Sequence, residues 1–124
     1  MLLLPWPDKS MSPNSRKHRL AVAPVRARYR NICKIRAMNA QMNFAHLADV
    51  GLHLRITFHP PCIRKRDIDN MLGAFKSGLD GLSDAFGVDD SKWEITIRRG
   101  VAVKDGHISV EVISTGSEYV WRGA

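Results

Sequence analysis

The sequence is poor in cysteine and contains no long hydrophobic run. Its two cysteines, Cys33 and Cys62, form no CxxC pattern, so neither a disulfide framework nor a zinc site is indicated and reduced thiols are expected. The apolar residues 2–4 are too few for the core of a signal peptide, and Pro5 and Pro7 follow at once. We therefore expect a cytoplasmic protein that is neither exported nor embedded in a membrane.

Several common catalytic motifs are also missing. The sequence has no GxSxG, no Walker-type phosphate loop and no GxGxxG, so serine hydrolases, P-loop enzymes and dinucleotide enzymes are not supported. The five histidines are scattered without an HxxxH-like spacing. We therefore assign no histidine base.

Acidic residues are absent between Asp8 and Asp49. That stretch carries Lys9, Arg16, Lys17, Arg19, Arg26, Arg28, Arg30, Lys34 and Arg36. Over the whole chain, 19 Lys and Arg against 12 Asp and Glu give a formal charge of +7, which points toward a polyanionic partner such as nucleic acid. Charge alone leaves a merely basic protein as an equal alternative. The asymmetry suggests that one region binds phosphates while another uses carboxylates.

The hydrophobic pattern predicts one layered α+β domain over residues 1–124, with a mixed sheet and two main helices. A chain of 124 residues is long enough for one core and short for two. The expected elements are strands at 1–6, 52–59 and 93–98, helices at 24–48 and 68–86, a hairpin of 101–103 with 108–113 around Asp105-Gly106, and a flexible tail at 115–124.

Three cations of the first expected helix, Arg26, Arg30 and Lys34, recur every four residues and form one basic edge. The helix has no acidic residue to pair with them. This edge is either a phosphate-facing ridge or an ordinary solvated face, and the sequence leaves both open.

Two carboxylates, Asp67 and Asp69, stand at the start of the second expected helix, directly after three cations. Mg²⁺ prefers oxygen ligands and takes one or two protein carboxylates while keeping water and substrate phosphate. Asn70 can add an amide or orient a ligand. The alternative is that these aspartates only cap the helix, and a short DxD pattern also arises by chance.

A second acidic pair, Asp89-Asp90, follows Gly87 before the strand that begins near Trp93. Turn chemistry alone can explain it. If that strand lies beside the one ending at His59, however, we expect both acidic segments to meet at one sheet edge and to hold one or two Mg²⁺ ions for phosphodiester hydrolysis.

Lys76 is the candidate cation of this site. At about 100° per residue, Asp69 and Lys76 point to nearly the same side of a continuous helix. A cation there can meet the charge that develops on the phosphate. The alternative is a solvated lysine paired with Asp80.

The run Arg66-Asp67-Ile68-Asp69-Asn70, followed by a helix and Gly87-Val88-Asp89-Asp90, resembles the RusA family of Holliday-junction resolvases, many of them from phages and prophages. Leu4-Pro5-Trp6-Pro7, Ser12-Pro13-Asn14 and the basic residues 16–19 are similar to that family's amino-terminal strand and basic loop. Together these segments cover most of the chain.

The resemblance implies a homodimeric, Mg²⁺-dependent endonuclease, with Mn²⁺ able to substitute, that makes paired nicks in four-way DNA junctions during recombination and repair. It places the metal ligands on Asp67, Asp69 and Asp90. In an alignment without gaps, the position of the family's catalytic lysine falls on Gly73, which has no side chain to act as that cation. The position falls on Lys76 only if the helix carries a small insertion. We expect DNA contacts from Asn14, Arg16, Lys17, Arg19, Arg26, Arg30, Lys34, Arg64, Lys65 and Arg66, with Asn70 and Asp89 in support.

Two other interpretations stay open at this point. In one, the chain is a non-catalytic nucleic-acid-binding module whose aspartates are caps and turns. In the other, it is a metal-dependent nuclease of broader range that also cuts flaps or forks.

Overall fold

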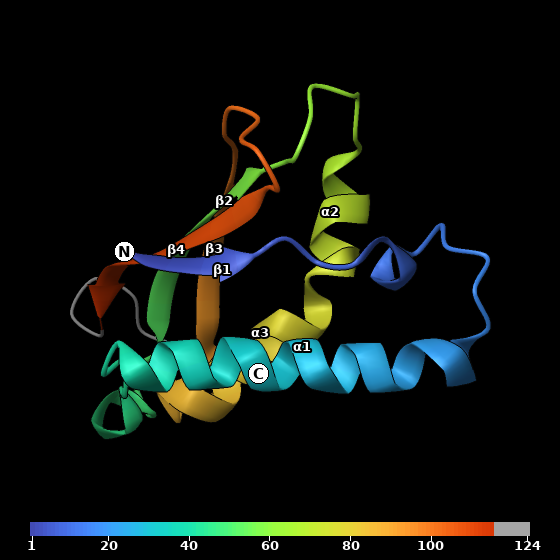
Figure 1. Ribbon diagram of the computed structural model, residues 1–124. Coiled ribbons are helices and arrows are strands. Elements are labelled where there is room, and N and C mark those ends of the chain that lie inside the picture. Colours follow the sequence, from blue (N-terminus) through green and yellow to red (C-terminus); the bar gives the residue numbers. More distant parts are fainter. Residues whose placement is uncertain (116–124) are drawn as a thin grey trace.

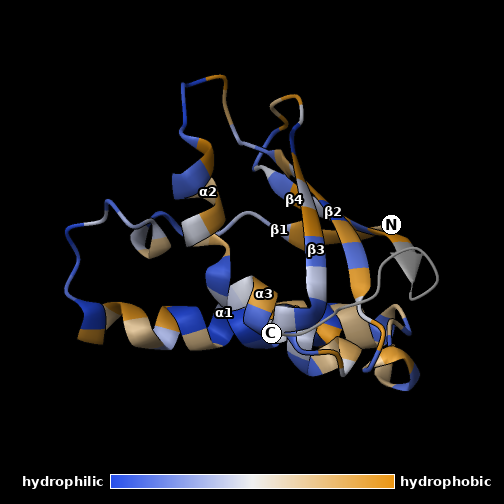
Figure 2. Ribbon diagram, turned by 180° about the vertical axis from the view of Figure 1, so that it is seen from behind, coloured by the Kyte–Doolittle hydropathy of each residue, from blue (hydrophilic) through white to orange (hydrophobic). Residues whose placement is uncertain are grey.

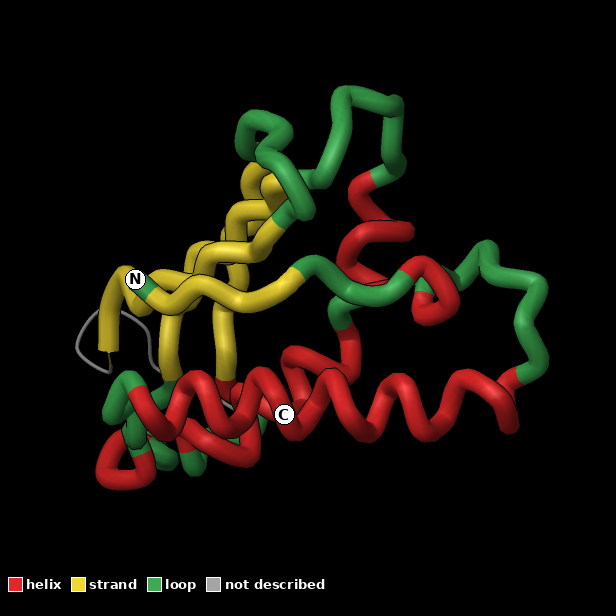
Figure 3. Tube along the Cα trace, in the orientation of Figure 1, coloured by secondary structure: helices red, strands yellow, loops and turns green. Residues whose placement is uncertain are grey.

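A computed structural model describes residues 1–115, and its elements form a four-stranded sheet with helices gathered to one side (Figures 1 and 3). The strands are β1 Leu2–Pro5, β2 Leu52–His59, β3 Trp93–Arg99 and β4 His107–Thr115. The helices are α1 Arg19–Asn39, α2 Ile68–Ala74 and α3 Lys76–Phe86, with short 3₁₀ turns η1 Lys9–Met11, η2 Ala45–Leu47 and η3 Asp90–Lys92. The expected α+β class is confirmed.

The sheet is mixed, as the sequence predicts. Its strand order is β1-β4-β2-β3, and β4 runs antiparallel to both β1 and β2. β2 and β3 are parallel, with Leu52 opposite Trp93 and Phe58 opposite Arg99. The helices α2 and α3 make the crossover between these two parallel strands, so β2 and β3 both begin at the same end of the sheet.

One face of the sheet carries the core. Along β2 the side chains alternate between buried and half-buried, which is the period-two pattern of a strand covered on one face. The covered face packs on α1 and α3 through residues such as Tyr29, Cys33 and Leu82. The opposite face is polar, where Arg55 pairs with Glu111 at 3.7 Å.

The first helix lies earlier in the chain than the predicted 24–48. It begins after His18, whose Nδ1 accepts a hydrogen bond from the backbone nitrogen of Leu20 at 3.2 Å. Pro24 therefore lies inside the helix instead of opening it. The helix ends at Asn39, and Gln41 takes a φ of 58°, a left-handed conformation that a helix cannot continue through.

The predicted helix 68–86 is interrupted at Phe75 (φ −87°, ψ −1°), so α2 and α3 are separate helices with different directions (Figure 1). The Phe75 ring is fully buried and lies edge-on to Tyr29 and Phe58, with centroids 6.2 and 6.0 Å apart. Gly78 leaves room for it, since a Cβ there would lie 2.5 Å from the ring. Core packing at Phe75 thus coincides with the break.

The predicted hairpin is also wrong. Asp105 and Gly106 do form a tight turn, with φ values of 65° and 70°, but residues 101–103 are not a strand. β4 inserts between β1 and β2 and does not pair with β3. Of the predicted tail, residue 115 belongs to β4, and 116–124 lie outside the described residues. Within 1–115, no helix combines the length and apolarity needed to span a membrane.

Candidate functional site

A cleft of about 830 Å³ lies between the amino-terminal segment and the start of α2. Its apolar lining comes from Trp6, Pro61, Met71 and Ala74. Its polar lining includes Lys9, Asn14, Arg64, Lys65, Arg66, Asp67 and Asn70. The fold therefore brings the basic loop before α2, one aspartate of the DxD pair and part of the amino-terminal loop to one depression.

Asp67 occupies the N-cap position of α2, yet its side chain caps no backbone N–H. Its Oδ2 instead accepts a hydrogen bond from Nδ2 of Asn70 at 3.4 Å. Asp69 lies in the first turn, and both carboxylates are exposed. The capping interpretation therefore does not account for Asp67. Asn70 contacts its carboxylate, and a supporting role for Asn70 stays a prediction.

The basic loop before α2 is braced by Arg66. Its Nη1 donates to the backbone oxygens of Cys62 (3.0 Å) and Arg64 (3.1 Å), and its Nη2 approaches Cys62 Sγ at 3.3 Å. Its guanidinium carbon lies 5.9 Å from the centroid of the Trp6 ring. These contacts make Arg66 a residue that shapes the loop, while Arg64 and Lys65 remain exposed for phosphate contact.

Cys62 itself is exposed. The Arg66 contact, together with the backbone near Arg64, lowers the pKa of its thiol. Both cysteines are free, Cys33 in the core and Cys62 at the surface.

Asp89 and Asp90 lie in the turn that leads into β3. Asp89 caps η3: its carboxylate accepts hydrogen bonds from the backbone nitrogen of Ser91 (3.2 Å) and from the Ser91 hydroxyl. These bonds lower the pKa of Asp89. The turn interpretation therefore holds for Asp89, whereas Asp90 is exposed at the first position of η3.

The two acidic segments do not meet within one chain, contrary to expectation. Asp67 follows the carboxyl end of β2, whereas Asp90 precedes the amino end of β3, and the two strands are parallel. β3 has 7 residues, which at about 3.3 Å per residue separates its ends by roughly 20 Å. Among residues 1–115, no three His, Cys, Asp or Glu side chains are grouped closely enough to hold a metal ion.

Lys76 and Asp69 do not share one continuous helix, contrary to the expected alignment of the two side chains. Lys76 is exposed and opens α3, beyond the break at Phe75. Gly73 lies within α2, and a Cβ there would come 2.5 Å from Cγ of Pro13. The amino-terminal loop thus packs on the position where the resemblance expects a lysine.

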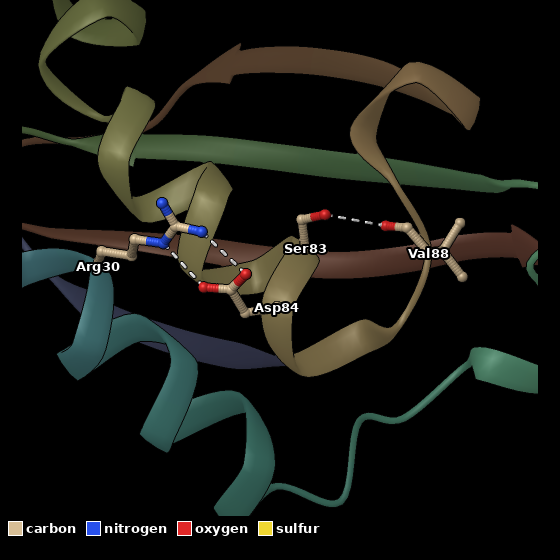
Figure 4. A network of polar contacts seen from close by, with 4 residues as sticks. All are labelled: Arg30, Ser83, Asp84 and Val88. Atoms are coloured by element: carbon tan, nitrogen blue, oxygen red, sulfur yellow. Dashed lines mark hydrogen bonds and ion pairs between the residues drawn. The ribbon is translucent and has the colours of Figure 1, made fainter.

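The basic edge of α1 lies against α3 at Arg30 and Lys34. Arg30 forms a two-pronged ion pair with Asp84 (Nε to Oδ2 2.8 Å, Nη2 to Oδ1 3.0 Å; Figure 4). This pair raises the pKa of Arg30 and lowers that of Asp84, to which Lys34 adds a weaker attraction. α1 carries no acidic partner of its own, but α3 supplies Asp84, so the Arg30 guanidinium is already engaged. The phosphate-facing ridge on α1 stays a prediction.

The remaining candidates for DNA contact lie at the cleft, on the segment before α1 or on α1 itself. Asn14 lines the cleft. Arg16, Lys17 and Arg19 are exposed on the segment that leads into α1, and Arg26 is exposed on the helix itself.

Two residues of this region had no sequence signal. Trp6 looked like the end of a strand, yet it lines the cleft beside Arg66. Arg99 lies just beyond the strand expected at 93–98, yet its Nη1 donates to the backbone oxygen of Arg66 at 2.8 Å. Only the parallel pairing of β2 and β3, which aligns Phe58 with Arg99, reveals the second contact.

No protein-family model matches the sequence. The chain is 39% identical over 93 residues to an uncharacterized protein of Xylella fastidiosa (strain Temecula1). The matched region covers 74% of this chain but 61% of that relative, so the chain spans less than two thirds of the relative's length.

Proposed function

We propose that this protein is a Mg²⁺-dependent endonuclease that cuts branched DNA, with the four-way junction as its principal substrate. One observation carries the proposal: Asp67 lines a cleft whose other charged side chains are mostly cations, including Arg64 and Lys65. The exposed Asp69 lies two residues further on, in the first turn of α2. Carboxylates surrounded by cations suit a phosphodiester and a divalent ion together.

The donor set at the start of α2 fits Mg²⁺. Asp67 and Asp69 provide two hard oxygen donors, which is the usual protein share of a Mg²⁺ site. Nδ2 of Asn70 donates to Oδ2 of Asp67 at 3.4 Å and would keep that carboxylate in place. When bound, the ion supplies an activated water and a counter-charge for the leaving oxygen.

The third proposed ligand, Asp90, would have to come from a second copy of the chain. β3 is an edge strand with no partner on its outer side within residues 1–115. If two β3 strands pair antiparallel about Thr96, Trp93 of one copy lies opposite Arg99 of the other. This pairing would bring the amino end of β3 in one copy, which follows Asp90, to the carboxyl end of β3 in the other copy. At that carboxyl end Arg99 contacts Arg66, the residue before Asp67.

A homodimer of this kind also suits the substrate. Each active site hydrolyses one strand, and a four-way junction presents two symmetric strands. Arg64, Lys65 and Lys9 would position the arms through phosphates without reading bases, so binding should weaken steeply with added salt.

Cleavage of a mobile four-way junction, a flap and a linear duplex, each with and without Mg²⁺, tests the proposal. We expect paired nicks in the junction that require Mg²⁺. Asp69→Asn should lower cleavage at least ~100-fold while junction binding persists, because it removes an ion ligand and not a phosphate contact. Binding without any cleavage by the native chain would favour a non-catalytic module, and equal rates on linear duplex would exclude junction specificity.

Mixed dimers test the sharing of Asp90. Co-expressed Asp69→Asn and Asp90→Asn chains can form a dimer in which one site keeps all three native carboxylates, so single nicks should return. Co-expressed Asp67→Asn and Asp69→Asn chains cannot form such a site and serve as the control. Activity in neither mixture would show that the carboxylates are not shared across the dimer.

A further inference from the structure

Two loops project from the same end of the molecule, residues 60–66 before α2 and residues 100–106 before β4 (Figure 1). Each carries an exposed apolar side chain. Ile63 is 95% exposed and Val101 is 75% exposed. Seen from behind, both loops show hydrophobic segments in their projecting parts (Figure 2).

The two loops are joined to each other and to the sheet. The backbone nitrogen of Val103 donates to the oxygen of Pro60 at 2.9 Å, and Gly100 donates to Phe58 at 2.8 Å. A hollow of about 430 Å³ lies between them, lined by Ile63 from one loop and Ala102 from the other. Arg66 donates to the backbone oxygens of Cys62 and Arg64, the residues on either side of Ile63, so the backbone around Ile63 is braced.

Single exposed apolar residues are ordinary on protein surfaces, so Ile63 alone would carry little weight. Here, however, Ile63 is followed directly by Arg64 and Lys65, and Val101 lies close to Arg99 and Lys104 in the sequence. An apolar tip between cations complements a nucleic acid, in which an apolar base step lies between two phosphate backbones. It does not complement an apolar protein surface, where the flanking charges would lose their water.

We propose that Ile63 inserts between bases at the branch point of DNA, with Val101 covering the same opening from the second loop. The proposal rests on the proposed function, since it takes branched DNA as the ligand. Inserting a side chain requires bases to unstack, which costs least where stacking is already interrupted. The insertion would therefore favour a branch over a continuous duplex, next to the Asp67 carboxylate that begins α2.

Fluorescence of 2-aminopurine placed at the branch point of a four-way junction tests the insertion. The measurement uses the full chain carrying Asp69→Asn, without divalent ions, at saturating protein. We expect binding to raise the fluorescence, Ile63→Ser to remove most of that rise and Ile63→Leu to retain it. Ile63→Ser should also weaken junction binding about tenfold and leave linear-duplex binding within about twofold.

Leu20→Ser is the matched control, because Leu20 is 73% exposed on α1 and belongs to neither loop. Equal fluorescence for Ile63→Ser and Leu20→Ser would overturn the insertion even if the native chain cleaves junctions. An Ile63-dependent rise without cleavage by the native chain would support the insertion and reject the nuclease. Absence of DNA binding by the native chain would overturn both.

Discussion

Arg99, the last residue of β3, donates a hydrogen bond from Nη1 to the backbone oxygen of Arg66 at 2.8 Å. Arg66 immediately precedes Asp67, so this contact ties the edge strand of the sheet to the start of the proposed metal-binding segment. Arg66 in turn donates to the backbone oxygens of Cys62 and Arg64. The backbone directly before Asp67 is therefore held by a contact between residues 33 apart in the sequence.

We predict that Arg99→Ala lowers junction cleavage about tenfold, because a lost charged hydrogen bond releases the backbone before Asp67. Arg99 acts here as a positioning residue. The Mg²⁺ concentration for half-maximal activity should rise, whereas Tm should change little, since the side chain is exposed. Arg98→Ala removes the same charge one residue earlier and is the control. Equal effects of the two substitutions would assign the loss to charge alone.

We predict that Arg30→Gln leaves DNA binding nearly unchanged, because the guanidinium is already engaged by Asp84. Arg64→Gln, at the cleft, should reduce the slope of log K against log salt by about one unit. Filter binding or fluorescence anisotropy at several salt concentrations measures both slopes. A loss for Arg30→Gln as large as that for Arg64→Gln would restore the ridge interpretation of α1.

Much of the fold could be predicted from local pattern. The alternation of apolar and polar residues over 52–59 gave β2 with its correct bounds, and Gly87 does end α3, with a φ of 71°. The break at Phe75 could not be predicted, since the apolar spacing continues through it. The break coincides with the burial of the Phe75 ring against residues distant in the sequence, beside the space left by Gly78.

Only those parts of the candidate site that are close together in the sequence could be predicted. Asp67, Asp69 and Asn70 are neighbours in sequence and at one helix start, as expected. Where Asp90 lies relative to them depends on whether β3 runs parallel or antiparallel to β2, which the hydrophobic pattern does not encode. The ion pair of Arg30 likewise depends on which helix packs against α1.

The close approach of α1 and α3 gives a stability prediction. A Cβ on Gly81 would lie 2.2 Å from the backbone oxygen of Arg30, so Gly81→Ala must push the helices apart. We expect a loss of roughly 1–3 kcal/mol in the free energy of unfolding. This exceeds the gain of up to about 1 kcal/mol that alanine brings over glycine inside a helix.

Gly73→Ala is the matched control for this prediction, measured by urea denaturation in the same buffer. Its added Cβ would meet Cγ of Pro13 at 2.5 Å, which is a side-chain atom of a surface loop that can shift. The loss should therefore be smaller than for Gly81. A larger loss at Gly73 would indicate that the amino-terminal loop is held more firmly on α2 than the two helices are on each other.

The two cysteines should differ in reactivity. Cys62 is exposed and the Arg66 contact lowers its pKa, so its thiolate fraction at neutral pH is increased. Cys33 is buried, and that burial raises its pKa to about 12. A thiol reagent at pH 7 should therefore modify one cysteine in the native protein and two in urea. Modification of two in the native protein at equal rates would contradict the burial of Cys33.

The same burial gives a dependence of stability on alkaline pH. The Cys33 thiol has its ordinary pKa of 9.0 in the unfolded chain and a pKa of about 12 in the folded protein. Between these two pH values the folded state keeps a proton that the unfolded state loses. The contribution of this thiol to stability is complete below pH 9 and is lost progressively as the pH rises toward 12. Urea unfolding between pH 8 and 11 should show a steeper loss for the native chain than for Cys33→Ala. Burial also raises the pKa of Tyr29, which lowers the stability of the native chain and of Cys33→Ala alike at alkaline pH. Equal slopes of stability against pH for the two chains would therefore show that Cys33 is ionised in the folded protein.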